Sequence, residues 1–205
     1  MKIRFDTRAA AKTAFVALTL LLAGCDPVAE VPAWGTLPDF SLINQGAEPY
    51  GTEQLEDRPW IANFIFTKCP SRCPMLTREM SQLQTELHGL GWDDVMLVSI
   101  SVDPANDTPE ALTAYAAKHG AKLGGWQFLT GTRDDIWSLS VDGFKLPVQE
   151  IEDTGEGPIL HSDRFVLTDG RQQIRGYYDA FDTDDRAKLL RDLEFVRAES
   201  APATR

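Results

Sequence analysis

Two uninterrupted apolar runs mark the centre of the chain and predict buried strands. The first, residues 60–67, follows Pro59 and is rich in aromatic residues, and the second covers residues 95–102. Such continuous runs are typical of strands that are buried on both faces in a parallel sheet. We therefore expect two parallel core strands here, with shorter strands at 39–43 and 126–129.

Helical periodicity follows the first apolar run. Apolar residues recur there at spacings of four and three, which is the pattern of one buried helix face. They are Leu76, Met80, Leu83, Leu87 and Leu90. Gly89 and Gly91 are expected to end this helix.

Three further helices are expected later in the chain. The segment 107–110 offers an N-cap, a first-turn proline and an early acid for a helix that stops at Gly120. A short helix is expected at 134–139. A last helix carries Leu189, Leu193 and Val196 on one face.

The C-terminal part adds antiparallel strands. Asp169-Gly170 stands between the strand-like runs 164–168 and 172–178, which is a strong hairpin signal. Residues 150–158 read as a loop, and its stretch 150–156 is acidic. The order of elements predicts an α/β thioredoxin-like fold with a central mixed sheet flanked by helices.

The N-terminus has the proportions of a signal peptide. A basic region precedes ten mostly apolar residues, 13–22, and Leu22-Ala23-Gly24-Cys25 follows. A permanent membrane span needs about 20 apolar residues, so this stretch is short. Leu22–Cys25 resembles the bacterial lipobox, which implies cleavage before Cys25 and lipid attachment to its sulfur. Asp26 then resembles an inner-membrane retention signal. An ordinary cleaved signal or an uncleaved anchor are the alternatives.

These signals divide the chain into four parts. We expect a signal peptide at 1–24, a membrane tether at 25–38, one domain at 39–198 and a short tail at 199–205. The 205 residues are enough for one domain with a sizeable core. The formal net charge of -11 argues against nucleic acid as a partner. A tethered monomer is the default expectation.

Cys69 and Cys73 are the candidate chemistry. If residues 69–73 are helical, the two sulfurs share one face near a helix N-terminus, where thiolates are stabilised. Lys68 and Arg72 add positive charge beside them. Such a pair can relay electrons, hold a soft metal ion, or form a passive disulfide, which would stabilise the fold little because its loop is tiny.

The three histidines differ in their settings. His88 and His119 lie beside glycines at predicted helix ends, where a surface position is the simplest interpretation. His161 lies between the acidic loop and a predicted strand. Spacing alone does not bring His161 to the cysteines.

Three ordered motifs carry a resemblance to a known family. Phe66–Pro74, Ser101–Pro109 and His161-Ser162 with Leu167–Gly170 are similar to the signature of the Sco (SenC/PrrC) family. The resemblance implies a thioredoxin-like fold and one copper ion, Cu(I) or Cu(II), bound by Cys69, Cys73 and His161. Family members often have an acid directly before the histidine, where this chain has Leu160. Asp103 is expected to cap a turn, and a role for it near the metal stays open.

The resemblance also implies a function and partners. Family members help to assemble the binuclear copper site of cytochrome c oxidase subunit II, either as copper chaperones or by reducing its cysteines. Expected partners are subunit II or another periplasmic copper protein, thiol reductants and other copper chaperones. The expected location is the periplasm, with a lipid anchor in the inner membrane, and the acidic loop 150–156 either attracts the ion, docks a partner or is simply solvated.

Two thiol chemistries compete with copper binding. A dedicated thiol-disulfide oxidoreductase would use Cys69 and Cys73 as its redox pair, although thioredoxin-type motifs have two residues between the cysteines rather than three. A peroxidase is disfavoured, because Thr67 lies two residues before Cys69 instead of three and Asn63 stands where peroxiredoxins have proline.

Overall fold

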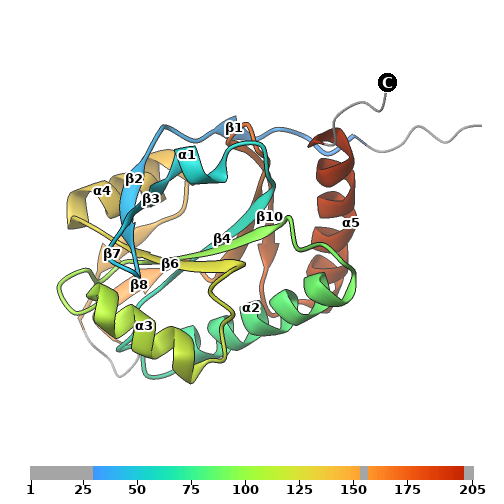
Figure 1. The fold of residues 1–205 in the computed structure, drawn as a ribbon. Coiled ribbons are helices and arrows are strands. Elements are labelled where there is room, and N and C mark those ends of the chain that lie inside the picture. Colours follow the sequence, from blue (N-terminus) through green and yellow to red (C-terminus); the bar gives the residue numbers. More distant parts are fainter. Residues whose placement is uncertain (1–29, 153–156, 201–205) are drawn as a thin grey trace, which may run out of the picture. The chain divides into compact units, whose positions relative to one another are not determined.

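The computed structural model describes residues 30–152 and 157–200, and residues from Val31 onward form one compact unit. An eight-stranded sheet runs through this unit in the order β1-β10-β9-β4-β5-β6-β2-β3 (Figure 1). Its strands are β1 (Gly35–Thr36), β2 (Ser41–Asn44), β3 (Pro49–Gly51), β4 (Trp60–Ile65), β5 (Met96–Ser101), β6 (Trp126–Thr130), β9 (Arg164–Thr168) and β10 (Gln173–Asp179).

The centre of the sheet is parallel and its flanks are antiparallel. β4 and β5 are buried at every position, and β5 pairs in parallel with both β4 and β6. β9 pairs antiparallel with β4, and β2 pairs antiparallel with β6. The two apolar runs are therefore the two central strands, and the predicted mixed sheet is confirmed.

In the described part of the chain, six helical segments accompany the sheet. They are α1 (Thr52–Leu55), α2 (Arg72–Gly89), α3 (Pro109–Lys118), α4 (Arg133–Ser138), the π-helical turn η1 (Leu139–Gly143) and α5 (Thr183–Ser200). α2 and α3 lie on one side of strands β4 to β6, and α1 and α4 lie on the other (Figure 1). The predicted apolar face of α2 is buried except at its end. Leu90 lies beyond the helix and is 50% exposed, because α2 already ends at Gly89.

A second, two-stranded sheet was not expected from the sequence. β7 (Val148–Glu150) and β8 (Ile159–His161) form an antiparallel hairpin in which Val148 is opposite His161. Residues 150–158, which the sequence assigned to a loop, are thus largely the connection of this hairpin. Asp153 and Glu156 of the acidic stretch lie outside the described residues, and Glu150 forms an ion pair with Arg133 at 2.6 Å.

The domain begins before residue 39. Val31 and Leu37 are buried, and β1 pairs with β10, so residues 31–38 pack on the domain instead of serving as part of the tether. The expected signal peptide, Cys25 and residues 201–205 of the expected tail lie outside the described residues, whereas Glu199 and Ser200, also assigned to the tail, belong to α5. Within 30–152 and 157–200, no helix combines the length and apolarity needed to cross a bilayer.

Candidate metal centre

Cys69 and Cys73 lie just beyond the carboxyl end of β4. The chain turns after this strand, and the Cys69 N–H donates to the Phe66 carbonyl at 3.3 Å. α2 begins at Arg72, so Cys73 is in its first turn and Cys69 precedes the helix. The condition considered from the sequence, that residues 69–73 are helical, therefore does not hold at Cys69.

The Cys69 sulfur takes the place of a capping oxygen at the start of α2. The Cys73 N–H donates to Cys69 Sγ at 3.3 Å, while the Ser71 side chain does not cap the helix. The first N–H groups of a helix have no partner within the helix, and they stabilise negative charge placed against them. A thiolate at Cys69 satisfies both requirements.

The two thiols differ in acidity as a result. A hydrogen bond from the Cys73 side chain, with backbone N–H groups of Cys73, Ser71 and Arg72, lowers the pKa of Cys69 to about 5. Donating that hydrogen bond and being buried raise the pKa of Cys73 well above its usual value. The reduced pair is therefore one thiolate and one thiol at neutral pH.

The basic neighbours of the cysteines are engaged elsewhere. The Lys68 ammonium group donates to the Asn106 side chain, and the Arg72 guanidinium pairs with Asp163, two residues after His161. Arg72 also lies over the Phe181 ring, 5.0 Å from its centroid. Arg72 thus connects the start of α2 to the segment that follows β8.

His161 reaches the cysteines from the β7–β8 hairpin. Its Nε2 atom lies 3.2 Å from Cys73 Sγ, and its Nδ1 atom lies 2.9 Å from the Ser162 carbonyl oxygen. A carbonyl can only accept, so Nδ1 carries the proton and Nε2 keeps its lone pair. Burial lowers the pKa of His161, which keeps the ring neutral. The group that orients the ring is therefore a backbone carbonyl. The acid that family members often have directly before the histidine, replaced here by Leu160, does not serve this purpose in this chain.

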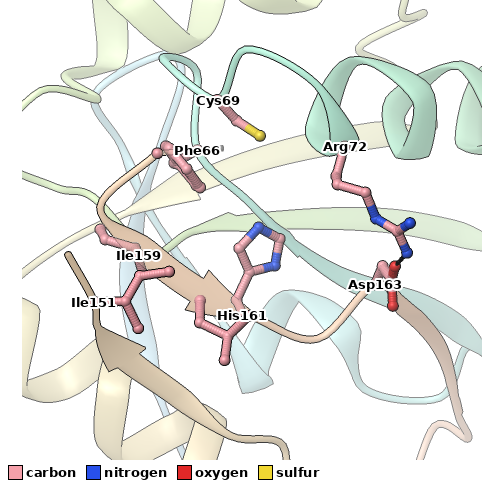
Figure 2. A pocket seen from close by; sticks show the side chains of 9 residues that line it. Phe66, Cys69, Arg72, Ile151, Ile159, His161 and Asp163 are labelled. Atoms are coloured by element: carbon pink, nitrogen blue, oxygen red, sulfur yellow. Dashed lines mark hydrogen bonds and ion pairs between the residues drawn. The ribbon is translucent and has the colours of Figure 1, made fainter. Parts of the chain in front are cut away.

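The Cys69 sulfur and the His161 imidazole border a pocket of about 340 Å³ (Figure 2). Figure 2 shows the Cys69 sulfur and the His161 ring directed into it from different walls. The Phe66 and His161 rings pack edge to face, with the ring centroids 5.6 Å apart. The pocket is lined by Phe66, Cys69, Arg72, Ile151, Gly157, Ile159, Leu160, His161 and Asp163.

A buried carboxylate holds the cysteine loop against β5. Asp107 accepts from the Thr67 N–H at 3.0 Å, the Thr67 hydroxyl at 2.5 Å and the Ser101 hydroxyl at 2.5 Å. Burial raises the pKa of Asp107. Thr108, next in the chain, caps α3. From the sequence, Asp107 was assigned to the start of a helix and to the Ser101–Pro109 motif of the family resemblance, but no local pattern signals its contact with Thr67.

The other candidates do not join the site. Asp103 bonds within its own turn, where its carbonyl accepts from the Asn106 and Asp107 N–H groups. His88 pairs with Asp93 at 2.8 Å, and His119 packs on Tyr115 with ring centroids 4.4 Å apart. These positions agree with structural roles for Asp103 and both histidines.

Cys69 and His161 line one pocket and the buried Cys73 lies against His161, but the three predicted ligands do not form a complete metal site. Within the described part of the chain, no three His, Cys, Asp or Glu side chains already have the geometry of a bound ion. The donor set itself, two sulfurs and a neutral imidazole, suits copper or another soft ion. Binding through all three requires side-chain adjustment and loss of the Cys73 proton.

Comparison with known proteins identifies relatives over most of the chain. The SCO1/SenC family model matches residues 32–196. The "Putative copper-binding protein" of Stutzerimonas stutzeri is 33% identical over 148 residues, which cover 72% of this chain and 71% of that protein.

Two solved structures have the same fold. A SCO1/SenC family lipoprotein from Bacillus anthracis has a TM-score of 0.73 and 33% identity, covering 78% of this chain and 94% of its own. BsSco, described with a disulfide switch as a member of the Sco family of cytochrome c oxidase assembly proteins, has a TM-score of 0.70 and 30% identity, covering 81% and 94%. The predicted thioredoxin-like α/β fold is confirmed.

Proposed function

This chain belongs to the SCO1/SenC family, and we propose that it is a membrane-anchored periplasmic copper chaperone for the assembly of cytochrome c oxidase. In this proposal Cys69, Cys73 and His161 hold one copper ion, which is passed to the binuclear copper site of subunit II. Residues 1–24 are a signal peptide, and lipid on Cys25 anchors the chain to the inner membrane.

One contact carries the proposal for the metal. His161 Nε2, unprotonated because Nδ1 donates to the Ser162 carbonyl, lies 3.2 Å from Cys73 Sγ. Metal-bound histidines commonly have their second ring nitrogen fixed in this way. The relative from Stutzerimonas stutzeri is named for copper binding, which supports copper as the ion.

Two relatives support the proposed role in assembly and the proposed lipid anchor. BsSco is described as belonging to a family of cytochrome c oxidase assembly proteins, and the neighbour from Bacillus anthracis is described as a lipoprotein. The lipobox-like sequence that ends at Cys25 agrees with such an anchor.

The site suits a cargo ion that must both enter and leave. Cys69, already a thiolate, offers the first ligand without losing a proton. Cys73 loses its proton as copper binds, so acid favours release of the ion. His161 supplies the third proposed ligand from a separate hairpin, and movement of that hairpin can open the site.

Copper titration tests the ligand set. The reduced protein is titrated with Cu(I) against a competing chelator, and one ion per chain is expected. His161→Ala should weaken copper binding by at least tenfold. His119→Ala should leave copper binding unchanged, because the His119 ring packs on Tyr115 away from the site. An affinity of His161→Ala equal to that of the parent protein contradicts the proposal.

The unequal acidity of the cysteines favours thiol-disulfide exchange as a second candidate. The Cys69 thiolate attacks a partner disulfide, and the Cys73 thiolate then displaces the partner's second sulfur. The partner gains two electrons, the proton that Cys73 gives up on becoming a thiolate and a second proton from solvent, and Cys69 and Cys73 become a disulfide. Copper binding and this disulfide exclude one another.

One variant separates the two candidates. His161→Ala keeps both sulfurs and should retain disulfide exchange with a model substrate, while copper binding falls. Restored assembly of cytochrome c oxidase by this variant, in cells that lack the parent protein, favours the reductase. Failure favours copper delivery.

A further inference from the structure

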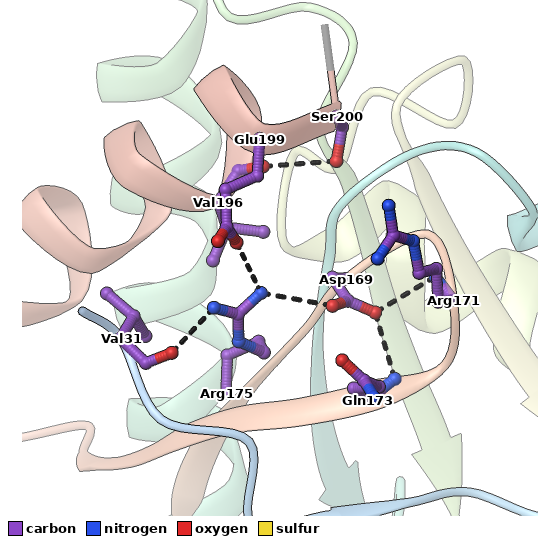
Figure 3. Close-up of polar contacts among 8 residues, drawn as sticks. All are labelled: Val31, Asp169, Arg171, Gln173, Arg175, Val196, Glu199 and Ser200. Carbon is purple, nitrogen blue, oxygen red and sulfur yellow. Dashed lines mark hydrogen bonds and ion pairs between the residues drawn. The ribbon is translucent and has the colours of Figure 1, made fainter.

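A buried arginine fixes the point at which the N-terminal segment joins the domain (Figure 3). The Arg175 side chain is 7% exposed. It donates to the Val31 carbonyl at 2.6 Å, to Asp169 at 3.1 Å and to Glu199 at 2.6 Å. Three distant parts of the chain, the start of the domain, the β9–β10 turn and the end of α5, are therefore held at one place.

This place lies at the opposite end of the sheet from the candidate metal centre. Thr168 and Ile174, which flank the Arg175 cluster, pair with each other, and Thr168 pairs with Trp60 at the start of β4. The cysteines follow the other end of β4. Figure 1 likewise shows β1 and the end of α5 far from the β7–β8 hairpin. The six residues of β4 span about 20 Å, and this length separates the Arg175 cluster from the cysteines.

The segment held by Arg175 presents an exposed tryptophan. Residues 31–38 contain no charged residue, and Pro32, Ala33 and Trp34 are exposed. Trp34 is 66% exposed, more than any other large apolar side chain in the described residues. Its backbone is fixed, because its N–H donates to the Ile174 carbonyl at 2.8 Å. Packing inside the domain gives no reason for a tryptophan here.

We propose that this surface, formed by Pro32, Ala33 and Trp34, rests on the membrane, with Trp34 at the level of the lipid headgroups. The proposal rests on lipid attachment to Cys25 in the proposed function. Only residues 26–30 separate Cys25 from Val31, so the clamped segment begins within about 20 Å of the anchor. Tryptophan favours the membrane interface, because its ring is apolar and its N–H is polar.

The charges nearby indicate that contact is driven by the aromatic side chain and the anchor. Arg58 and Arg171 are exposed at this end, but so are Asp57 and Glu30. With both signs present, no net attraction to anionic lipid is expected, and uncharged phosphatidylcholine should suffice. The metal centre, at the far end of the sheet, then faces away from the bilayer.

Fluorescence quenching by brominated lipid tests the contact. The processed full chain is reconstituted into phosphatidylcholine vesicles with brominated or ordinary acyl chains, after mass spectrometry of the peptide that carries Cys25. We expect brominated lipid to lower tryptophan emission. Trp34→Phe should abolish this loss, whereas Trp137→Phe should keep it, because Trp137 contacts Val102 beyond the opposite end of β5.

The outcomes separate this inference from the proposed function. An acylated chain with equal emission in both kinds of vesicle overturns the membrane contact alone, as does quenching that survives Trp34→Phe. A Cys25 without lipid overturns both the anchor and the contact. Copper titration of the same preparation reports on the metal centre independently.

Discussion

The Nε2 atom of His161 lies 3.2 Å from the Sγ atom of Cys73, although 88 residues separate them in the chain. The cysteine belongs to the helix that follows a central strand, and the histidine belongs to a hairpin outside the main sheet. A movement of this hairpin would change the distance between the His161 imidazole and the two cysteine sulfurs.

Alkylation should distinguish the two cysteines. Thiolates react with iodoacetamide and thiols do not, so in the reduced, metal-free protein Cys69 should be labelled first at pH 7. Its rate should fall as the pH is lowered through about 5. Peptide mass spectrometry at a series of pH values measures both effects.

The matched variant removes the hydrogen bond to the thiolate. Cys73→Ala should raise the pKa of Cys69, because the Cys73 side chain is the largest cause of its low value. Equal labelling of Cys69 and Cys73 in the parent protein, or an unchanged profile in Cys73→Ala, contradicts the thiolate–thiol pair.

Asp107→Asn should change how stability depends on pH. Folding raises the pKa of this carboxyl group, so its protonated form favours the folded state. The parent should therefore lose stability relative to Asp107→Asn as the pH rises above about 4, the ordinary pKa of an aspartate. Urea unfolding of the metal-free proteins at several pH values measures the difference.

An exposed aspartate supplies the control for this experiment. Asp134→Asn, on the surface of α4, makes the same substitution at an exposed position and is unfolded beside the parent at each pH. If Asp107→Asn keeps a constant stability difference from the parent, the buried carboxylate does not titrate differently in the folded state.

Gly157→Ala should disturb the site without unfolding the domain. Gly157 has a φ of +99°, and a Cβ atom there would lie 2.6 Å from Phe66 Cζ. The strain should destabilise the fold by about 1–3 kcal/mol, and the displaced Phe66 ring should shift His161. Weaker copper binding is the expected result, measured by chelator competition.

Gly120→Ala provides the comparison. It has a φ of +69° but no atom within 4 Å of the added Cβ, so it carries backbone strain alone. Its copper affinity should equal that of the parent. If Gly120→Ala and Gly157→Ala weaken copper binding equally, the contact with Phe66 is not the cause.

Arg175→Met should destabilise the fold at pH 7 by about 3–5 kcal/mol, because it leaves the Asp169 carboxylate buried without its partner. Copper affinity of the folded protein should not change, since the cluster lies at the other end of the sheet. Thermal unfolding and copper titration measure the two effects. Adding Asp169→Asn should recover part of the lost stability, and a double variant as unstable as the single one contradicts this explanation.

Local sequence patterns predicted the elements that have a continuous buried run or one buried face. Continuous apolar runs located β4 and β5, and helical spacing located the buried face of α2. The strands β7 and β8 have three residues each and are mostly exposed or half-buried, so no period marks them. The packing of Val31 depends on Arg175, which lies 144 residues away, and no local signal predicts it.

The candidate site could be predicted only in part for the same reason. The cysteines share one short motif, but nothing in the spacing of His161 brings it to them, and the family resemblance supplied it. The thiolate was expected from a helix N-terminus and from the charges of Lys68 and Arg72. The structure attributes it first to the Cys73 side chain and also to the backbone at the start of α2, whereas Lys68 and Arg72 pair with other residues. Hydrogen bonds to a sulfur depend on the turn geometry, which composition does not encode.

The separate β7–β8 hairpin has a consequence for how this protein can change over evolutionary time. Both sulfurs belong to the main α/β unit, and the imidazole belongs to a small sheet of its own. In the proposed copper site, mutations in the hairpin can therefore weaken the binding of the ion while the pair of cysteines stays intact. A lineage that loses His161 would keep the two cysteines of the proposed redox pair, so one ancestral scaffold can give rise to descendants specialised for carrying metal and others specialised for carrying electrons.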